Sequence, residues 1–142
     1  MPPNPRENDE AMMRLAIREA RKGIGKTHPN PAVGAVLVRK GKILARGWHR
    51  AAGCPHAEIE ALKKSPDPRG ATLYVTLEPC STHGRTPPCT SAIIQAGIAR
   101  VVFGATDPNP AHVGRAAAIL KKAGVEVLSG VLSSECALLN RA

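Results

Sequence analysis

Apolar residues recur along the chain with two periods, one typical of helices and one typical of strands. Between residues 7 and 22, alanine and leucine recur near the helical period, and Gly23 and Gly25 predict where that helix ends. Residues 32–38 are apolar and β-branched, and the turn signal Lys40-Gly41-Lys42 leads into a second segment over 43–48, which predicts a hairpin. The later pattern predicts, in order, a helix over 55–64, a strand over 72–76, a helix over 87–96, a strand over 100–104, a helix over 112–123, a strand over 125–128 and a helix over 133–141.

This order of elements predicts an α/β fold with a mixed five-stranded sheet. The hairpin supplies antiparallel strands, and the later strands are expected to be parallel because each is joined to the next through a helix. Parallel strands are usually buried on both faces, so we expect helices on both sides of the sheet and three α-β-α layers. Gly124 is expected to end the helix before the last strand, and Ser133 or Ser134 to cap the last helix. No repeat or second domain is indicated, so residues 1–142 are expected to form one domain.

The net charge narrows the class of partner. It is +9 over 142 residues, which favours an anionic partner, either nucleic acid or a phosphorylated small molecule. A solvated helix face explains much of this charge, since Arg14, Arg18, Arg21 and Lys22 fall at helical spacing. With one Trp, one Tyr and one Phe, the chain offers little aromatic surface for stacking single-stranded nucleic acid. A small phosphorylated partner is therefore favoured over nucleic acid.

The apolar runs are too short for a membrane protein. A helix that crosses a bilayer needs about 18 or more consecutive apolar residues, and this chain has no such run. The first ten residues are polar and rich in proline, without the basic and then apolar pattern of a signal peptide. These features predict a cytoplasmic location, where cysteines are expected as metal ligands or plain thiols rather than disulfides.

Four residues form a constellation that carries chemistry. His56, Cys80 and Cys89 are side chains of the types that bind zinc, and three protein ligands leave a fourth position for a water molecule. Glu58 could then move protons without binding the metal. A His-x-Glu pair followed by Pro-Cys and a second cysteine is the signature of zinc-dependent nucleobase deaminases, here with eight residues between the cysteines instead of two. The sequence therefore predicts a zinc-dependent hydrolytic deaminase.

The spacing of His56 and Glu58 sets a geometric condition. Positions two apart on a regular helix point about 200° away from each other, so both can serve one pocket only if the helix begins there. Pro55 supports such a start. An alternative is a closed structural zinc site in which Cys54 is the fourth ligand, but that site would give Glu58 no role. Cys136 is expected to be a buried apolar residue of the last helix.

These residues lie in longer segments that resemble the deaminase domain of the bacterial RibD proteins of riboflavin biosynthesis. The resemblance covers nearly the whole chain, and the eight-residue gap between the cysteines separates this family from the otherwise similar tRNA adenosine deaminases. The segments that carry it are Pro29-Asn30-Pro31, Val33-Gly34-Ala35, Gly47-x-His49, residues 72–81, residues 84–89 and Asp107-Pro108-Asn109-Pro110.

The resemblance implies a fold, a reaction and a set of roles. The fold is that of the cytidine deaminases, and the reaction removes the C2 amino group of 2,5-diamino-6-ribosylamino-4(3H)-pyrimidinone 5′-phosphate. Zinc would be bound by His56, Cys80 and Cys89, with Glu58 as the catalytic proton shuttle. The positions expected to contact the substrate are Asn30, His49, Ala57, Thr82, His83 and Arg85, with Arg85 near the phosphate. A homodimer is expected. RibD proteins usually continue into a reductase domain, which is absent from this sequence.

The chain departs from the family at two places. Thr82 stands where the family usually has a substrate-contacting histidine. Three outcomes are open: the Thr82 hydroxyl makes the contact, the neighbouring His83 makes it, or the contact is lost. Gly114 is followed by Arg115 and Ala116 where the family commonly has Gly-x-Gly.

Two other functions stay open at this point. One is deamination of another nucleobase, a nucleoside or tRNA, and the other is a zinc-stabilised binding module without catalysis. His28 and His112 receive no role.

Overall fold

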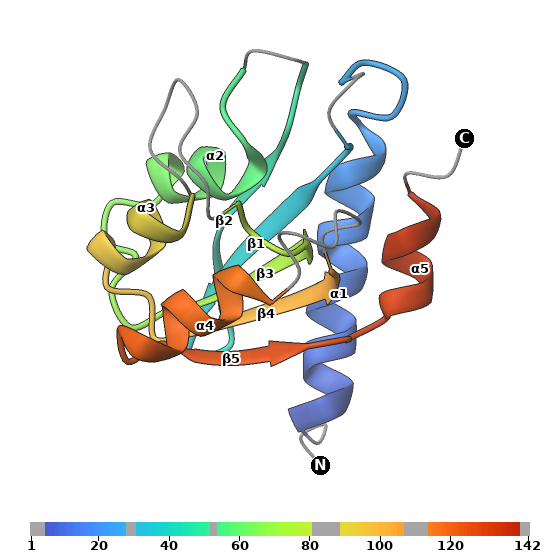
Figure 1. The fold of residues 1–142 in the computed structure, drawn as a ribbon. Helices are drawn as coiled ribbons and strands as arrows, with labels where there is room; N and C mark the ends of the chain where they lie inside the picture. The colour runs from blue at the N-terminus through green and yellow to red at the C-terminus, as the bar shows by residue number, and fades with distance from the viewer. Residues whose placement is uncertain (1–4, 28–30, 52–53, 81–88, 107–113, 140–142) are drawn as a thin grey trace.

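The computed structural model describes residues 5–27, 31–51, 54–80, 89–106 and 114–139, which form a sheet covered by helices on both faces (Figure 1). The elements are α1 (Pro5–Arg21), β1 (Gly34–Arg39), β2 (Lys42–Trp48), α2 (Ala57–Lys64), β3 (Thr72–Leu77), α3 (Cys89–Gln95), β4 (Arg100–Ala105), α4 (Arg115–Lys122), β5 (Glu126–Ser129) and α5 (Ser133–Leu138). The five strands are ordered β2-β1-β3-β4-β5. β1 is antiparallel to β2 and β3, whereas β4 is parallel to β3 and β5. The predicted mixed five-stranded α/β fold is confirmed.

The strands at the centre of the sheet are apolar on both faces, because successive side chains point to opposite sides. Along β1, Ala35 and Leu37 join a core with α2, α3 and α4, whereas Val36 and Val38 join a core with α1 and α5. β3 and β4 alternate in the same way between these two cores. This double burial is what the continuous apolar runs of the sequence predict.

Two glycines allow helices to approach the sheet closely. A Cβ atom at Gly34 would collide with the backbone of Ala16 in α1. A Cβ atom at Gly47 would collide with the carbonyl oxygen of Ala57 and lie 2.7 Å from the backbone nitrogen of Ala61. Gly47 therefore allows the first turn of α2 to rest directly on β2, which fixes the position of that end of the helix.

Some predicted helix ends are corrected by the structure. α5 begins at Ser133, so Ser133 and Ser134 lie inside the helix and neither caps it. The N-cap residue is Leu132, which has a left-handed φ of 53° and no side-chain hydrogen bond to the helix. α2 begins at Ala57 rather than at residue 55. α4 begins at Arg115, and Gly114 takes the left-handed conformation before it, while residues 112–113 lie outside the described residues. The prediction that Gly124 follows α4 in a glycine-type conformation is confirmed by its φ of 89°.

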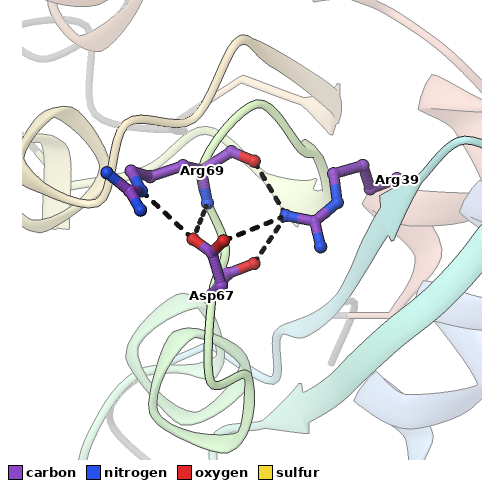
Figure 2. A network of polar contacts seen from close by, with 3 residues as sticks. All are labelled: Arg39, Asp67 and Arg69. Atoms are coloured by element: carbon purple, nitrogen blue, oxygen red, sulfur yellow. Dashed lines mark hydrogen bonds and ion pairs between the residues drawn. The ribbon is translucent and has the colours of Figure 1, made fainter.

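An exposed polar network holds the loop between α2 and β3 against the end of β1 (Figure 2). The Arg39 guanidinium donates to the backbone oxygens of Asp67 at 2.7 Å and Arg69 at 3.0 Å. The Asp67 carboxylate accepts from the backbone N–H of Arg69 at 3.4 Å and from its Nε at 3.2 Å. Solvent screens the charges in this network, so its contribution to stability is small.

A second network centres on the buried Asp9 carboxylate and joins three elements. The Asp9 carboxylate of α1 accepts two hydrogen bonds from Arg100 of β4, at 3.0 and 2.7 Å. It also accepts one from the Tyr74 hydroxyl of β3 at 2.7 Å. Burial raises the pKa of Asp9, but the hydrogen bonds from Arg100 and Tyr74 outweigh burial and the pKa is lowered. These hydrogen bonds link α1 to the neighbouring strands β3 and β4 of the sheet.

Asp9→Asn is expected to lower the free energy of unfolding by about 1.5–3 kcal/mol, the usual contribution of hydrogen bonds to charged groups. Because the folded-state pKa of Asp9 lies below its ordinary value of 3.8, its stabilisation is complete above that value. It is lost as the pH falls through the folded-state pKa, so the difference between the two proteins should shrink in acid.

Urea unfolding measured at neutral pH and again below pH 3.8 tests this expectation. Asp67→Asn is the matched control, since Asp67 also pairs with arginine but is exposed, and it should leave stability nearly unchanged. Equal effects of the two substitutions would contradict the role given to the buried network.

Candidate metal centre and active site

The predicted zinc ligands come from the starts of two helices and from the end of one strand. His56 is the N-cap of α2, Cys89 is the first residue of α3, and Cys80 follows β3. Figure 1 shows α2 and α3 on the same side of the sheet, and the two helices are in contact. The fold therefore brings together residues that are up to 33 positions apart in the sequence.

The donor atoms of these residues form a compact group. The Nδ1 atom of His56 lies 3.2 Å from the Sγ atom of Cys89 and 3.8 Å from that of Cys80. All three donor atoms lie within 4.8 Å of one another. Ligands in a tetrahedral zinc site, at about 2.0–2.3 Å from the ion, lie roughly 3.3–3.8 Å apart. The donor set and its spacing therefore fit zinc.

Cys54 does not join this group. Within the part of the chain that the structure describes, the only cluster of three or more possible metal ligands consists of His56, Cys80 and Cys89. Cys54 is exposed, and its backbone N–H bonds to the carbonyl oxygen of Ala51 at 3.1 Å. Three protein ligands leave a position for water, which is the arrangement of catalytic rather than structural zinc sites.

The electrostatics of the group favour a thiolate. The thiol and backbone N–H of Cys89 donate to the Cys80 sulfur, the backbone bond being 3.1 Å long, and His56 lies beside it. Burial alone would raise the pKa of Cys80, but these contacts outweigh it and lower the pKa to about 4. The pKa of Cys89 is raised, mainly because its proton is held in the bond to Cys80 and because the thiol is buried. A divalent cation in contact with both sulfurs favours the loss of this second proton as well.

Glu58 lies beside the sulfur ligands, in the first turn of α2. Its side chain is only 3% exposed, and burial raises the pKa of its carboxyl group. The Cys89 thiol contacts this carboxyl group and the charge of Cys80 lies nearby. A carboxylate with a raised pKa is a stronger base than an ordinary one, which suits a group that accepts a proton and returns it.

The position of His56 meets the geometric condition set by the His-x-Glu spacing. Its backbone is extended, with φ −68° and ψ 162°, because the helix begins at the next residue, Ala57. Because His56 lies outside the helix, its side chain does not follow the spacing of about 100° between helical residues. The His56 ring and the Glu58 carboxyl group can therefore reach the same two sulfurs. The sequence predicted a helix start near this pair, and the structure places it two residues later.

Two of the predicted substrate contacts lie at this site. His49 is 2% exposed and follows β2, and its ring meets that of His56 edge to face, with centroids 5.2 Å apart. Ala57 is fully buried against the sheet, at the start of α2. The other four predicted contacts lie outside the described residues and stay predictions: Asn30, Thr82, His83 and Arg85.

The supporting roles of two residues were not predicted from the sequence. Thr90 is buried behind the ligands, and its backbone N–H donates to the Cys80 carbonyl oxygen at 3.2 Å. Gly47 allows α2 to approach β2, and a glycine inside a predicted strand is a general sign of a close backbone contact. Cys136 of α5 is buried in the core that α5 shares with α1, as predicted.

Comparisons with known proteins agree with this geometry. A sequence model of the family described as "Cytidine and deoxycytidylate deaminase zinc-binding region" matches residues 6–105. The riboflavin biosynthesis protein RibD of Aquifex aeolicus is 54% identical over 136 residues, which are 95% of this chain and 38% of that protein. The present chain therefore spans less than two-fifths of the length of this relative.

Solved structures show the same likeness. A diaminohydroxyphosphoribosylaminopyrimidine deaminase/5-amino-6-(5-phosphoribosylamino)uracil reductase from Thermotoga maritima superposes with a TM-score of 0.89 and 49% identity, over 95% of this chain and 40% of that one. A dCMP deaminase from the cyanophage S-TIM5 superposes with a TM-score of 0.67 and 28% identity, over 91% of this chain and 99% of that one. The resemblance to the RibD deaminase domain that the motifs indicated is confirmed. The chain belongs to the family of the cytidine and deoxycytidylate deaminase zinc-binding region.

Proposed function

We propose that this chain hydrolyses the C2 amino group of 2,5-diamino-6-ribosylamino-4(3H)-pyrimidinone 5′-phosphate to give 5-amino-6-ribosylaminouracil 5′-phosphate and ammonia. The observation that carries the proposal is the group of three zinc-type ligands beside the buried Glu58 carboxyl group. The similarity to RibD proteins supports this substrate over others. The chain's relatives are longer, so the proposal concerns only the reaction that this part can carry.

Each residue has a part in the proposed reaction. Zinc held by His56, Cys80 and Cys89 would lower the pKa of a water molecule to about 7 and thereby supply a nucleophile near neutral pH. Glu58 accepts the proton that this water loses when its oxygen attacks C2 of the ring. Glu58 passes this proton to the adjacent ring nitrogen, and then takes the remaining proton of the new hydroxyl group and delivers it to the amino group. One C–O bond forms, the C–N bond breaks, and ammonia leaves.

The charge distribution supports a phosphorylated substrate. Among the described residues, four acidic side chains are buried, namely Asp9, Glu19, Glu58 and Glu78, and the net charge of the whole chain is +9. A protein with a positive net charge attracts anionic ligands in general, which agrees with a phosphorylated substrate. We propose Arg85 as the phosphate contact, and Asn30, Thr82 and His83 as contacts to the ring and ribose.

Turnover of the ribotide by zinc-loaded protein tests the proposed function. The uracil product and released ammonia are measured by chromatography and mass spectrometry, with cytidine, dCMP, guanine and tRNA as alternative substrates in the same buffer. We expect the ribotide to turn over and the alternatives to be inert. If the ribotide is inert while one of the others is deaminated, the substrate assignment is wrong and the deaminase assignment stands.

The second candidate is deamination of another nucleobase or nucleotide. The superposition on a dCMP deaminase over 99% of that chain supports it, because the same fold there acts on a free nucleotide. The identity of 28% to that protein, against 49% to the T. maritima protein, favours the first candidate.

We also infer three properties of this chain. Residues 1–142 form a single deaminase domain, which the near-complete coverage of a small deaminase supports.

A homodimer is supported by the exposed apolar residues Ile119 of α4 and Leu128 of β5, and light scattering of the purified protein tests it. A cytoplasmic location is supported by the likeness to bacterial biosynthetic enzymes, and cell fractionation tests it. Among the described residues, no helix is long and apolar enough to cross a membrane.

A further inference from the structure

The ring of His49 is fixed by two contacts that both lead to the zinc ligand His56. Its Nδ1 atom lies 3.0 Å from the carbonyl oxygen of Pro55. A carbonyl oxygen can only accept, so Nδ1 carries the hydrogen and donates it. The ring also packs edge to face on the His56 ring, with an angle of 86° between their planes.

The bond to Pro55 acts on the peptide unit that leads into His56. A peptide unit is planar, so the direction of the Pro55 carbonyl group sets the direction of the following N–H and Cα atom. On the other side of His56, its carbonyl oxygen accepts from Glu60 at 3.0 Å, in the first turn of α2. The backbone of the ligand is thus held on both sides, by the helix and by His49.

His49 is itself held firmly. Its backbone N–H donates to the Val33 carbonyl oxygen at 3.1 Å, which ties it to the chain entering β1. Its side chain is 2% exposed, so water has little access to replace the bond to Pro55. A buried donor between a rigid sheet and a helix N-terminus is well suited to keep a metal ligand in place.

We propose that His49 is a positioning residue of the zinc site, which acts through its Nδ1 hydrogen bond to Pro55 and orients the His56 ring. This role differs from contact with the substrate, which would use the other ring nitrogen or the face of the ring. The inference rests on the proposed zinc site but not on the identity of the substrate.

Two amide substitutions separate the ring nitrogens of His49. The side-chain amide of asparagine stands as many bonds from Cβ as Nδ1, whereas that of glutamine reaches the position of Nε2. His49→Asn can therefore keep the bond to Pro55, and His49→Gln cannot. His49→Ala removes both nitrogens, and the Asn and Gln pair still gives an answer if the Ala variant fails to fold.

The experiment measures zinc affinity by competition with a chromophoric chelator in the absence of substrate, so a wrong substrate assignment would leave the result unchanged. We expect His49→Asn to bind zinc within about threefold of the unchanged protein. His49→Gln should bind about 10–100-fold more weakly, the usual effect of losing a partner behind a metal ligand. The visible absorption bands of bound cobalt(II), which report the geometry of the ligands, should change in His49→Gln and stay in His49→Asn.

Two outcomes overturn the proposal. One is equal zinc affinity in the Asn and Gln variants and the unchanged protein. The other is the reverse order, in which His49→Gln retains zinc affinity and His49→Asn loses it, because that order would assign the role to Nε2. Circular dichroism of the metal-free variants shows that any loss of affinity does not come from unfolding.

Discussion

Glu58→Gln is expected to lower kcat for deamination by about 10²–10⁴-fold, the usual contribution of a positioned proton-transfer group. Glutamine has nearly the same shape as glutamate, so the helix start and the buried pocket should be preserved. It cannot accept the proton of the attacking water or return it to the leaving amino group. Because Glu58 is not among the donor atoms that gather around the proposed ion, the zinc content should stay near one ion per chain.

Glu60→Gln is the matched control for this substitution. Glu60 lies two residues further along the same helix and is half-buried. Glu60→Gln removes one negative charge from the first turn of α2, as Glu58→Gln does. No proposed step of the reaction uses Glu60, so the activity should stay within a few-fold. The role of Glu58 would be rejected if the Gln variant kept more than about a tenth of the activity. It would also be rejected if both variants lost activity equally.

Much of the fold could be predicted from the sequence, because the pattern records burial directly. Strands β1, β3 and β4 are buried on both faces, and their continuous apolar runs predicted central strands with helices on both sides. The antiparallel pairing of β1 with β3 could not be predicted from the sequence. The helix between β2 and β3 does not determine which strand β3 pairs with, or in which direction.

Helix ends were predicted less well, because they depend on backbone geometry that contacts elsewhere decide. α5 has serines in position to cap it, but its first turn begins at them, and Leu132 before it takes a left-handed conformation. Tertiary packing here overrides the capping preference of serine. α2 starts two residues after Pro55, which leaves His56 outside the helix and free to face the sulfurs.

The ligands of the candidate site could be predicted, but their supports could not. His56, Cys80 and Cys89 have distinct chemistry, so residue type and order were enough to single them out. The bond from His49 to Pro55 depends on how β2 meets α2, which no local pattern encodes.

Cys89→Ser is expected to weaken zinc binding by more than about 10²-fold and to reduce deamination in proportion. The loss of a residue behind a ligand costs about 10–100-fold in metal affinity, and the loss of a ligand must cost more. A serine hydroxyl is not ionised at neutral pH and offers zinc a poor donor in place of a thiolate.

Cys54→Ser separates an open zinc site from a closed one. Cys54 is exposed and lies two residues before His56, and it is outside the cluster of donor atoms. With three protein ligands, Cys54→Ser should leave zinc affinity and turnover unchanged. If Cys54 were a fourth ligand, its loss would weaken zinc binding about as much as Cys89→Ser. The two variants, compared by chelator competition and by cobalt(II) absorption in the thiolate charge-transfer region, therefore decide whether the fourth position is left for water, as hydrolysis requires.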